Sequence, residues 1–217
     1  MTRMLTRRDA MRLPGALIAV AGLSGAWRPA RAAGAEAVGK VAAVVGQSFT
    51  EAQGKRTALK PGDDVAVGKL IDVPADAKLK LQMRDGTTLA VASDTHMTIT
   101  ECETDAAGQR QDTKISLAQG LVRATVAPAG PQSVFQIASA IGTAVANGAD
   151  CFVEAKAEGM QVGVLAGSAV IASVGSARAE TIPARWGARV EAGRDPVPAR
   201  VWTPAEFAAV TARTNVS

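Results

Sequence analysis

The sequence has 217 residues, of which 24 are lysine or arginine and 20 are aspartate or glutamate. Residues 1–32 hold six of the basic residues and one of the acidic ones, so residues 33–217 carry 18 basic and 19 acidic residues, a net charge of −1. The basic charge belongs to the N-terminal segment, which removes the reason to expect nucleic acid or anionic lipid as a partner. Tyrosine is absent and six aromatic residues remain after residue 32, which argues against stacking platforms for sugars or single strands.

The first 32 residues have the three parts of a secretory signal peptide. Residues 1–12 are rich in arginine, the run from Leu13 to Ala26 is apolar, and Ala30-Arg31-Ala32 is a small-x-small cleavage site. The apolar run of 14 residues is shorter than the roughly 20 that a membrane-spanning helix needs. We expect cleavage after Ala32, with Ala35 as the alternative, and residues 33–217 as the mature chain.

The charged part of this segment resembles a twin-arginine translocation signal. Its residues are Thr6-Arg7-Arg8-Asp9-Ala10-Met11-Arg12, and a Gly/Ala-rich apolar run follows. Arg28 and Arg31, just before the cleavage site, disfavour the general secretory route. An ordinary secretory signal and an uncleaved anchor are the alternatives. The resemblance implies export through Arg7 and Arg8 and a periplasmic location.

From Val38 onward, apolar residues recur with a period close to two, which is typical of strands. The clearest case is 78–84, where Leu79, Leu81 and Met83 alternate with polar residues. Asp85-Gly86 follows, and then a second alternating run over 87–91. Asp-Gly between two such runs predicts a hairpin with a type I′ turn.

Similar runs predict strands over most of the mature chain. They cover 40–50, 96–100, 114–118, 121–126, 134–138, 151–155, 159–165, 169–174 and 188–191. Short strands at this spacing indicate an all-β fold, an antiparallel sandwich or roll, with a partly solenoid-like arrangement as the alternative. No linker or low-complexity tract interrupts 33–217, so we expect one domain.

One helix is predicted near the C-terminus. Thr203-Pro204-Ala205-Glu206 places threonine at the N-cap, proline at the first helical position and glutamate at the third, which is a capping box. The helix is expected over 204–212. Phe207 and Val210 lie three residues apart on it and are expected to dock onto the sheet.

The order of these motifs resembles the FecR-type periplasmic domain over roughly residues 38–200. The hairpin segment Leu79–Leu89 is the most recognisable match. The other segments, in the same order as in the family, are 39–46, 59–71, 117–122, 135–138, 141–146 and 164–170. The resemblance implies the fold and the envelope compartment.

The chain also departs from the FecR-type pattern. Where the family has Arg-Gly-Thr before an aromatic strand, this chain reads Asn147-Gly148-Ala149-Asp150-Cys151-Phe152. The sequence shows no cytoplasmic anti-sigma segment and no membrane span. We therefore expect a free-standing version of the domain, and the resemblance says less about signalling than about fold.

The sequence predicts no catalytic, cofactor-binding or metal-binding residue. His96 is the only histidine and alternates within a strand, so we expect a structural or solvent-facing side chain. Glu101, Glu103 and Asp105 alternate near Cys102, but zinc and calcium sites require other or denser ligands. We expect a solvated strand end.

Two pairs of residues remain as candidates. Cys102 and Cys151 are the only cysteines and would form a disulfide in an oxidising compartment; the alternative is that Cys151 is a small buried residue. Trp186 and Trp202 are the candidates for an interaction surface, because tryptophan is common at binding hot spots; the alternative is that they cap a sheet.

Two hypotheses about function follow. The first is a non-catalytic FecR-like binding, scaffold or regulatory domain that contacts an envelope protein or a cell-wall component, without nucleic acid and with membrane contact only through the signal segment. The alternative is a metal- or cofactor-carrying protein or enzyme, because the twin-arginine route often serves proteins that acquire cofactors before export.

Overall fold

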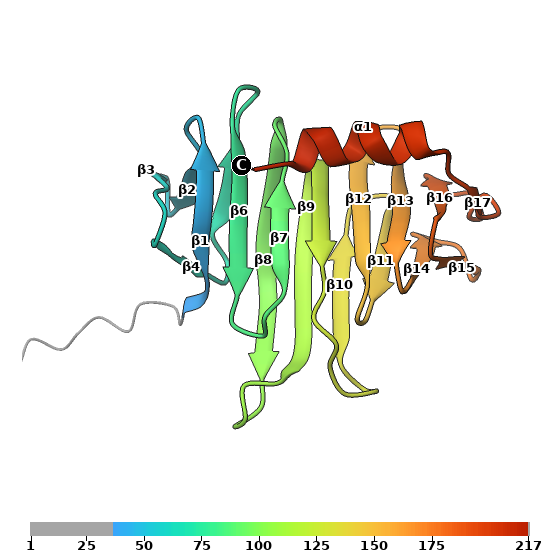
Figure 1. Ribbon diagram of the computed structural model, residues 1–217, viewed down its shortest axis with the longest axis horizontal. Coiled ribbons are helices and arrows are strands. Elements are labelled where there is room, and N and C mark those ends of the chain that lie inside the picture. The colour runs from blue at the N-terminus through green and yellow to red at the C-terminus, as the bar shows by residue number, and fades with distance from the viewer. Residues whose placement is uncertain (1–36, 217) are drawn as a thin grey trace, which may run out of the picture. The chain divides into compact units, whose positions relative to one another are not determined.

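The computed structural model describes residues 37–216, and these residues form strands almost throughout (Figure 1). The expected signal segment, with Arg7, Arg8, Ala30 and Ala32, lies outside the described residues. The strands, in chain order, are β1 (Ala37–Val45), β2 (Phe49–Ala52), β3 (Lys55–Ala58), β4 (Asp64–Ala66), β5 (Leu70–Val73), β6 (Lys78–Met83), β7 (Thr88–Val91), β8 (Thr95–Thr104), β9 (Arg110–Thr125), β10 (Val134–Ala138), β11 (Gly142–Ala146), β12 (Asp150–Lys156), β13 (Gly159–Ala166), β14 (Ser168–Ser173), β15 (Ala179–Pro183), β16 (Trp186–Glu191) and β17 (Arg200–Val201).

The period-two pattern becomes the inner faces of two sheets. Sheet A has the order β4-β1-β6-β7-β9-β12-β13-β16-β17. Sheet B has the order β3-β2-β5-β8-β9-β10-β11-β14-β15. Successive side chains of a strand point to opposite faces, so each strand gives alternate aliphatic residues to the space between the sheets. The all-β prediction is confirmed.

Strand β9 belongs to both sheets and joins them. Its first half pairs with β8 and β10 in sheet B, and its second half pairs with β7 and β12 in sheet A. Gly120 lies at the change of sheet with a φ of +105°, and a Cβ atom there would meet the Cα of Thr95 at 2.5 Å. Only glycine fits this combination of a positive φ and a close backbone approach. The pair β9–β10 is parallel, a difference from the antiparallel arrangement that we expected.

The core between the sheets is one continuous cluster of small and medium aliphatic side chains. It runs from Val38 and Val41 near the start of sheet A to Val190 on β16. Leu79, Leu81 and the other alternating residues of the hairpin are fully buried in it, as the pattern predicted. The chain has few aromatic residues, and its core accordingly consists mainly of closely packed aliphatic side chains.

The hairpin between β6 and β7 differs from the expected turn. A type I′ turn requires a positive φ at both central residues. Here Gly86 has a φ of +86°, whereas Asp85 is not among the residues with positive φ. Gly86 N donates to Met83 O at 3.2 Å, and Met83 N donates to Thr87 O at 2.8 Å. The loop is therefore a turn closed by a left-handed glycine, and the type I′ prediction was wrong.

The helix α1 (Pro204–Thr214) lies on the outer face of sheet A (Figure 1). Its capping box is present: Thr203 Oγ1 accepts from Glu206 N, and the Glu206 carboxylate accepts from Thr203 N. Phe207 packs with Phe152 and Trp202 in a second, smaller apolar cluster, and Val210 lies against it. The predicted docking of both residues is confirmed.

Two further interactions fix the far end of α1. Lys78 Nζ donates to Ala212 O at 2.9 Å and to Asn215 O at 3.2 Å, which places a cation at the helix C-terminus. Arg213 forms an ion pair with Glu154 at 2.8 Å.

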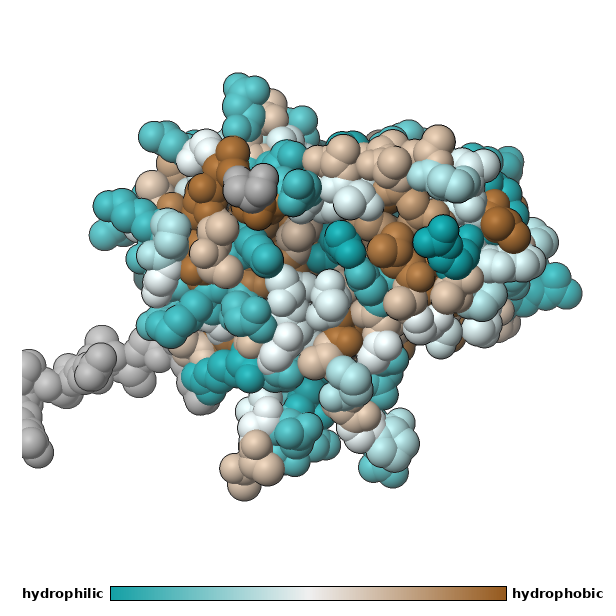
Figure 2. Space-filling view, viewed as in Figure 1, coloured by the Kyte–Doolittle hydropathy of each residue, from teal (hydrophilic) through white to brown (hydrophobic). Residues whose placement is uncertain are grey.

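Around the helix, hydrophobic residues on this face occur in small groups separated by hydrophilic ones (Figure 2). No helix among residues 37–216 is both long and apolar enough to cross a membrane.

Candidate interaction surface

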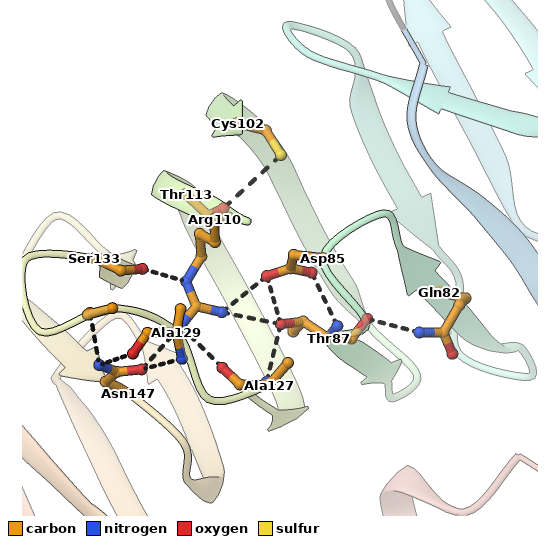
Figure 3. A network of polar contacts seen from close by, with 11 residues as sticks. Gln82, Asp85, Thr87, Cys102, Arg110, Thr113, Ala127, Ala129, Ser133 and Asn147 are labelled. Carbon is orange, nitrogen blue, oxygen red and sulfur yellow. Dashed lines mark hydrogen bonds and ion pairs between the residues drawn. The ribbon is translucent and has the colours of Figure 1, made fainter. Parts of the chain in front are cut away.

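A buried arginine holds one end of the sandwich together (Figure 3). Arg110, at the start of β9, has a side chain that is 1% exposed. Its Nη1 donates to Asp85 Oδ2 at 2.8 Å and to Thr87 Oγ1 at 3.2 Å. Its Nε donates to Ser133 at 3.0 Å, and its Nη2 donates to Ala127 O at 3.0 Å and Asn147 Oδ1 at 3.1 Å.

These contacts use all five N–H donors of the guanidinium group. The five acceptors come from the β6–β7 loop, the segment between β9 and β10, and the residue after β11, so one side chain ties three chain segments together. A guanidinium with every donor occupied by the protein is a structural group rather than a ligand-binding one. The sequence did not reveal Arg110, because its partners are spread from residue 85 to residue 147.

The acidic residues near the end of β8 lie partly together. Carboxylate oxygens of Glu101, Glu103 and Asp112 lie within 4.8 Å of one another. Lys114 Nζ lies 2.6 Å from Glu101 Oε2, which neutralises part of this charge. Asp105, which we expected on the same face, instead accepts from Ala107 N and Gln109 N in the turn after β8. The expected alternation fails because β8 ends at Thr104.

His96 and Cys102 point to separate surroundings. His96 Nε2 lies 3.2 Å from Asp72 Oδ1, and the same carboxylate pairs with Arg56 at 2.5 Å. Cys102 Sγ accepts a weak hydrogen bond from Thr113 Oγ1 at 3.8 Å. Neither side chain joins the acidic group, and the histidine is half-exposed, as a solvent-facing strand residue is expected to be.

The structure leaves the candidate disulfide unformed: Cys102 and Cys151 are both free thiols. Cys102 pairs with Thr113 in sheet B, whereas Cys151 pairs with Ala124 in sheet A. The cysteines therefore lie in different sheets and pair with different halves of β9. Burial, with a smaller contribution from Asp150, raises the pKa of Cys151 to about 12. The alternative reading, a small buried residue, describes Cys151.

The two tryptophans have different surroundings, and for Trp202 the alternative of capping a sheet replaces the candidate interaction surface. Trp202 is 6% exposed and covers two glycines of sheet A. A Cβ atom on Gly187 would lie 2.0 Å from its indole nitrogen, and one on Gly163 would lie 2.4 Å from its ring. The ring needs bare backbone beneath it, so Trp202 is a packing residue. Trp186 is 36% exposed and remains a surface candidate.

Exposed apolar side chains concentrate at the end of the sandwich where Trp186 lies. Among the described residues, the exposed large hydrophobic side chains are Val45, Val170, Val174, Trp186, Val197 and Val201. All except Val45 lie between the start of β14 and the end of β17, at the right-hand end of Figure 1. We define Trp186 and Val201, which face each other across β16 and β17, as the apolar shelf.

Comparisons with solved structures agree with this architecture. Two crystal structures from Parabacteroides distasonis, each described as that of an anti-sigma factor and solved at 2.50 Å and 1.65 Å, superpose on the chain with TM-scores of 0.54 and 0.53. Their sequence identities are 16% and 17%, so the likeness establishes the fold. Each covers 64% of this chain, and the chain spans 62% and 63% of their lengths.

Comparisons with curated proteins and with models of protein families bear on the family of this chain more directly than the shared fold does. No curated protein matches the chain. The model of the family described as FecR protein matches residues 69–170, the part that runs from β5 into β14. This match supports the FecR-type resemblance drawn from the hairpin and strand motifs.

Proposed function

We propose that this chain is a non-catalytic, regulatory FecR-type domain that works in the cell envelope by binding another protein. The observation that carries the proposal is the FecR match over residues 69–170, which includes β9, the strand shared by both sheets. The fold shared with structures described as an anti-sigma factor supports a regulatory role.

The distribution of side chains supports binding rather than chemistry. Arg110, the most deeply buried charged group among residues 37–216, donates every N–H of its guanidinium to acceptors of the protein itself. Trp186 on β16 and Val201 on β17, by contrast, are paired with each other and exposed. Two neighbouring apolar side chains in contact with solvent offer apolar area to a protein partner.

Export is the second part of the proposal, and the arginine pair tests it. Changing Arg7 and Arg8 together to lysine is expected to leave the chain unprocessed in the cytoplasm, because the twin-arginine route recognises the pair rather than its charge. Changing Arg3 and Arg12 to lysine is the matched control and is expected to leave processing intact. N-terminal sequencing of the exported chain is expected to begin at residue 33. Processing that is unaffected by the first variant would contradict the route.

Binding is tested with the exported chain as bait in envelope extracts, followed by cross-linking and mass spectrometry. We expect the bait to capture a small set of envelope proteins or cell-wall fragments. An excess of free chain is expected to displace them from the bait. Capture of nothing under several growth conditions would contradict the proposal. Elemental analysis of the same material tests the alternative, because a stoichiometric metal at Glu101, Glu103 and Asp112 would favour a metal-carrying protein.

A further inference from the structure

The sandwich is open between its two sheets at the tip of the β8–β9 hairpin. This hairpin extends past the ends of β1, β6 and β7 (Figure 1). Cys102 on β8 pairs with Thr113 on β9, and residues directly opposite each other in an antiparallel pair point to the same face. Thr113 alternates with Ile115 of the core, so Cys102 also faces the inside of the sandwich. Cys102 is nevertheless only half-buried, as the strands of sheet A end before they cover the tip of the hairpin.

A cleft of about 600 Å³ occupies this opening. Sites that take up a ligand or an anchoring side chain are concave, largely apolar inside and of comparable volume. The apolar residues that line this cleft are Val38 on β1, Val67 just after β4, and Cys102. Val38 belongs to the continuous core, and the other two are partly buried against it. The bottom of the cleft is therefore a part of the core that the two sheets leave uncovered.

The mouth of the cleft carries more acidic than basic groups. Arg84, Glu103 and Asp105 line it and are exposed. Glu103 also belongs to the acidic group near the end of β8, in which Lys114 pairs with Glu101. The charged side chains around the mouth are thus four acidic ones, Glu101, Glu103, Asp105 and Asp112, and two basic ones, Arg84 and Lys114, a net charge of −2. A positively charged segment would be attracted to this mouth.

The two parts of the cleft select different parts of an occupant. A charged group that entered the bottom would lose its hydration against Val38 and Val67 without gaining a partner there, whereas an aliphatic side chain would bury apolar area. Basic residues on either side of that aliphatic side chain would remain at the mouth, within reach of the carboxylates of Glu103 and Asp105. An aliphatic anchor between basic residues therefore complements both parts.

We propose that the cleft at the tip of the β8–β9 hairpin docks a segment of a partner protein in which an aliphatic side chain is flanked by lysine or arginine. This inference rests on the proposed function, since it names the chemistry of the partner. The aliphatic side chain completes the core beside Val38, Val67 and Cys102, and the basic residues pair with the acidic mouth.

The probe is a labelled synthetic peptide in which one leucine stands between two pairs of lysines. We expect the peptide to bind the exported chain, and a diazirine analogue at the leucine position is expected to cross-link to Val67 or to residues 102–106. Replacing the leucine by serine, or the lysines by glutamates, is in each case expected to weaken binding about tenfold or more. Failure of the first peptide to bind, equal binding of all three peptides, or cross-links confined to other parts of the chain would overturn the proposal.

Matched variants locate the site. Val67→Trp places a large side chain in the cleft and Glu103→Lys reverses a charge at its mouth, and each is expected to weaken peptide binding about tenfold or more. Val201→Trp, on the apolar shelf, and Glu158→Lys, in the turn between β12 and β13, make the same changes elsewhere and are expected to bind as wild type does. Thermal melts identify the variants that fold, and Glu103→Lys, an exposed change, decides the matter if Val67→Trp does not. Equal weakening by the control variants would contradict the proposed site.

Capture from envelope extracts separates this inference from the proposed function. If the exported chain captures a partner and both Val67→Trp and Glu103→Lys capture it equally well, the regulatory function stands and the docking site is wrong. If Val201→Trp alone loses the partner, the apolar shelf is the docking site instead. Binding of hexylamine without binding of the peptide, measured by calorimetry, would make the occupant a small molecule and overturn the proposal. Capture of nothing by any form contradicts the proposed function itself.

Discussion

At the scale of the residue, the most consequential side chain is Arg110. We expect Arg110→Met to lower the free energy of unfolding by about 3–5 kcal/mol, because the change leaves the Asp85 carboxylate buried without its counter-charge. Methionine keeps much of the volume, so the loss reports the polar network rather than a cavity. Urea unfolding followed by circular dichroism measures it.

Lys114→Met is the control for Arg110. Lys114 also pairs with a carboxylate, that of Glu101, but both side chains are substantially exposed. Exposed ion pairs contribute little to stability, so this variant is expected to unfold close to wild type. Equal losses for the two variants would show that the Arg110 network does not hold its three segments together.

The free thiols give a second prediction at this scale. Burial raises the pKa of Cys151 to about 12 and also raises that of Cys102, against the opposing hydrogen bond from Thr113. Since the thiolate is the reactive form, folded protein at pH 8 is expected to react slowly with a thiol reagent at both positions. Unfolding without reductant is then expected to reveal two thiols per chain. No reactive thiol after unfolding would show that a disulfide forms.

Residue roles were only partly predictable from the sequence, and the tryptophans show why. Trp186 and Trp202 look alike as late aromatic residues, and both were candidates for an interaction surface, with capping of a sheet as the alternative. Which one is buried depends on the pairing of β16 with β17, which turns Trp186 toward sheet B and Trp202 toward Gly187 and Gly163. The register between two strands is set by tertiary contacts, and a local sequence pattern does not reveal it.

At the scale of the element, the N-terminus of α1 carries a pH-dependent interaction. Hydrogen bonds from Arg200, and secondly from Thr203 N, lower the pKa of Glu206 to about 2 from its usual 4.5. A carboxylate with a lowered folded pKa stabilises the folded state above its unfolded pKa and loses that contribution as the pH falls. We expect α1 to loosen between pH 4.5 and 2, with a change in Trp202 fluorescence as the measurement.

Glu206→Gln is the variant that isolates this effect. Glutamine retains a capping oxygen but has no charge to lose, so the fluorescence change in this pH range is expected to shrink markedly. The ion pair between Arg213 and Glu154, at the other end of α1, is unchanged in this variant, so any acid-induced change that remains includes its contribution. A change of the same size in Glu206→Gln would assign the acid sensitivity to another carboxylate.

Most strands with a long alternation were predictable, but β5, an interior strand of four residues, was missed although its burial alternates. Strand β10 has the predicted bounds, and the helix runs two residues beyond its predicted end. Edge strands β3, β4, β15 and β17 were missed too, because short edge strands bury few side chains and so show no apolar period. Strand β9 was predicted as two strands separated at Gln119-Gly120, because glycine there also fits a turn. In the structure Gly120 carries the chain from one sheet to the other.

At the scale of the whole molecule, the shared core determines how the protein unfolds. The aliphatic cluster extends without interruption from Val38 to Val190, and β9 contributes to both sheets. Removing either sheet would expose the inner face of the other. Two sheets that share a strand and a core therefore have no independent parts of comparable stability.

We therefore expect residues 37–216 to unfold in a single cooperative transition. Far-UV circular dichroism reports on both sheets, and Trp202 fluorescence reports on the β16–α1 end, where the indole covers Gly163 and Gly187. Trp186→Phe removes the second tryptophan, and the two signals from this variant are expected to share one urea midpoint. The Arg110→Met variant, altered at the other end of the molecule, is expected to move both midpoints together. A Trp202 transition at lower urea than the circular dichroism transition would show that the C-terminal end unfolds by itself.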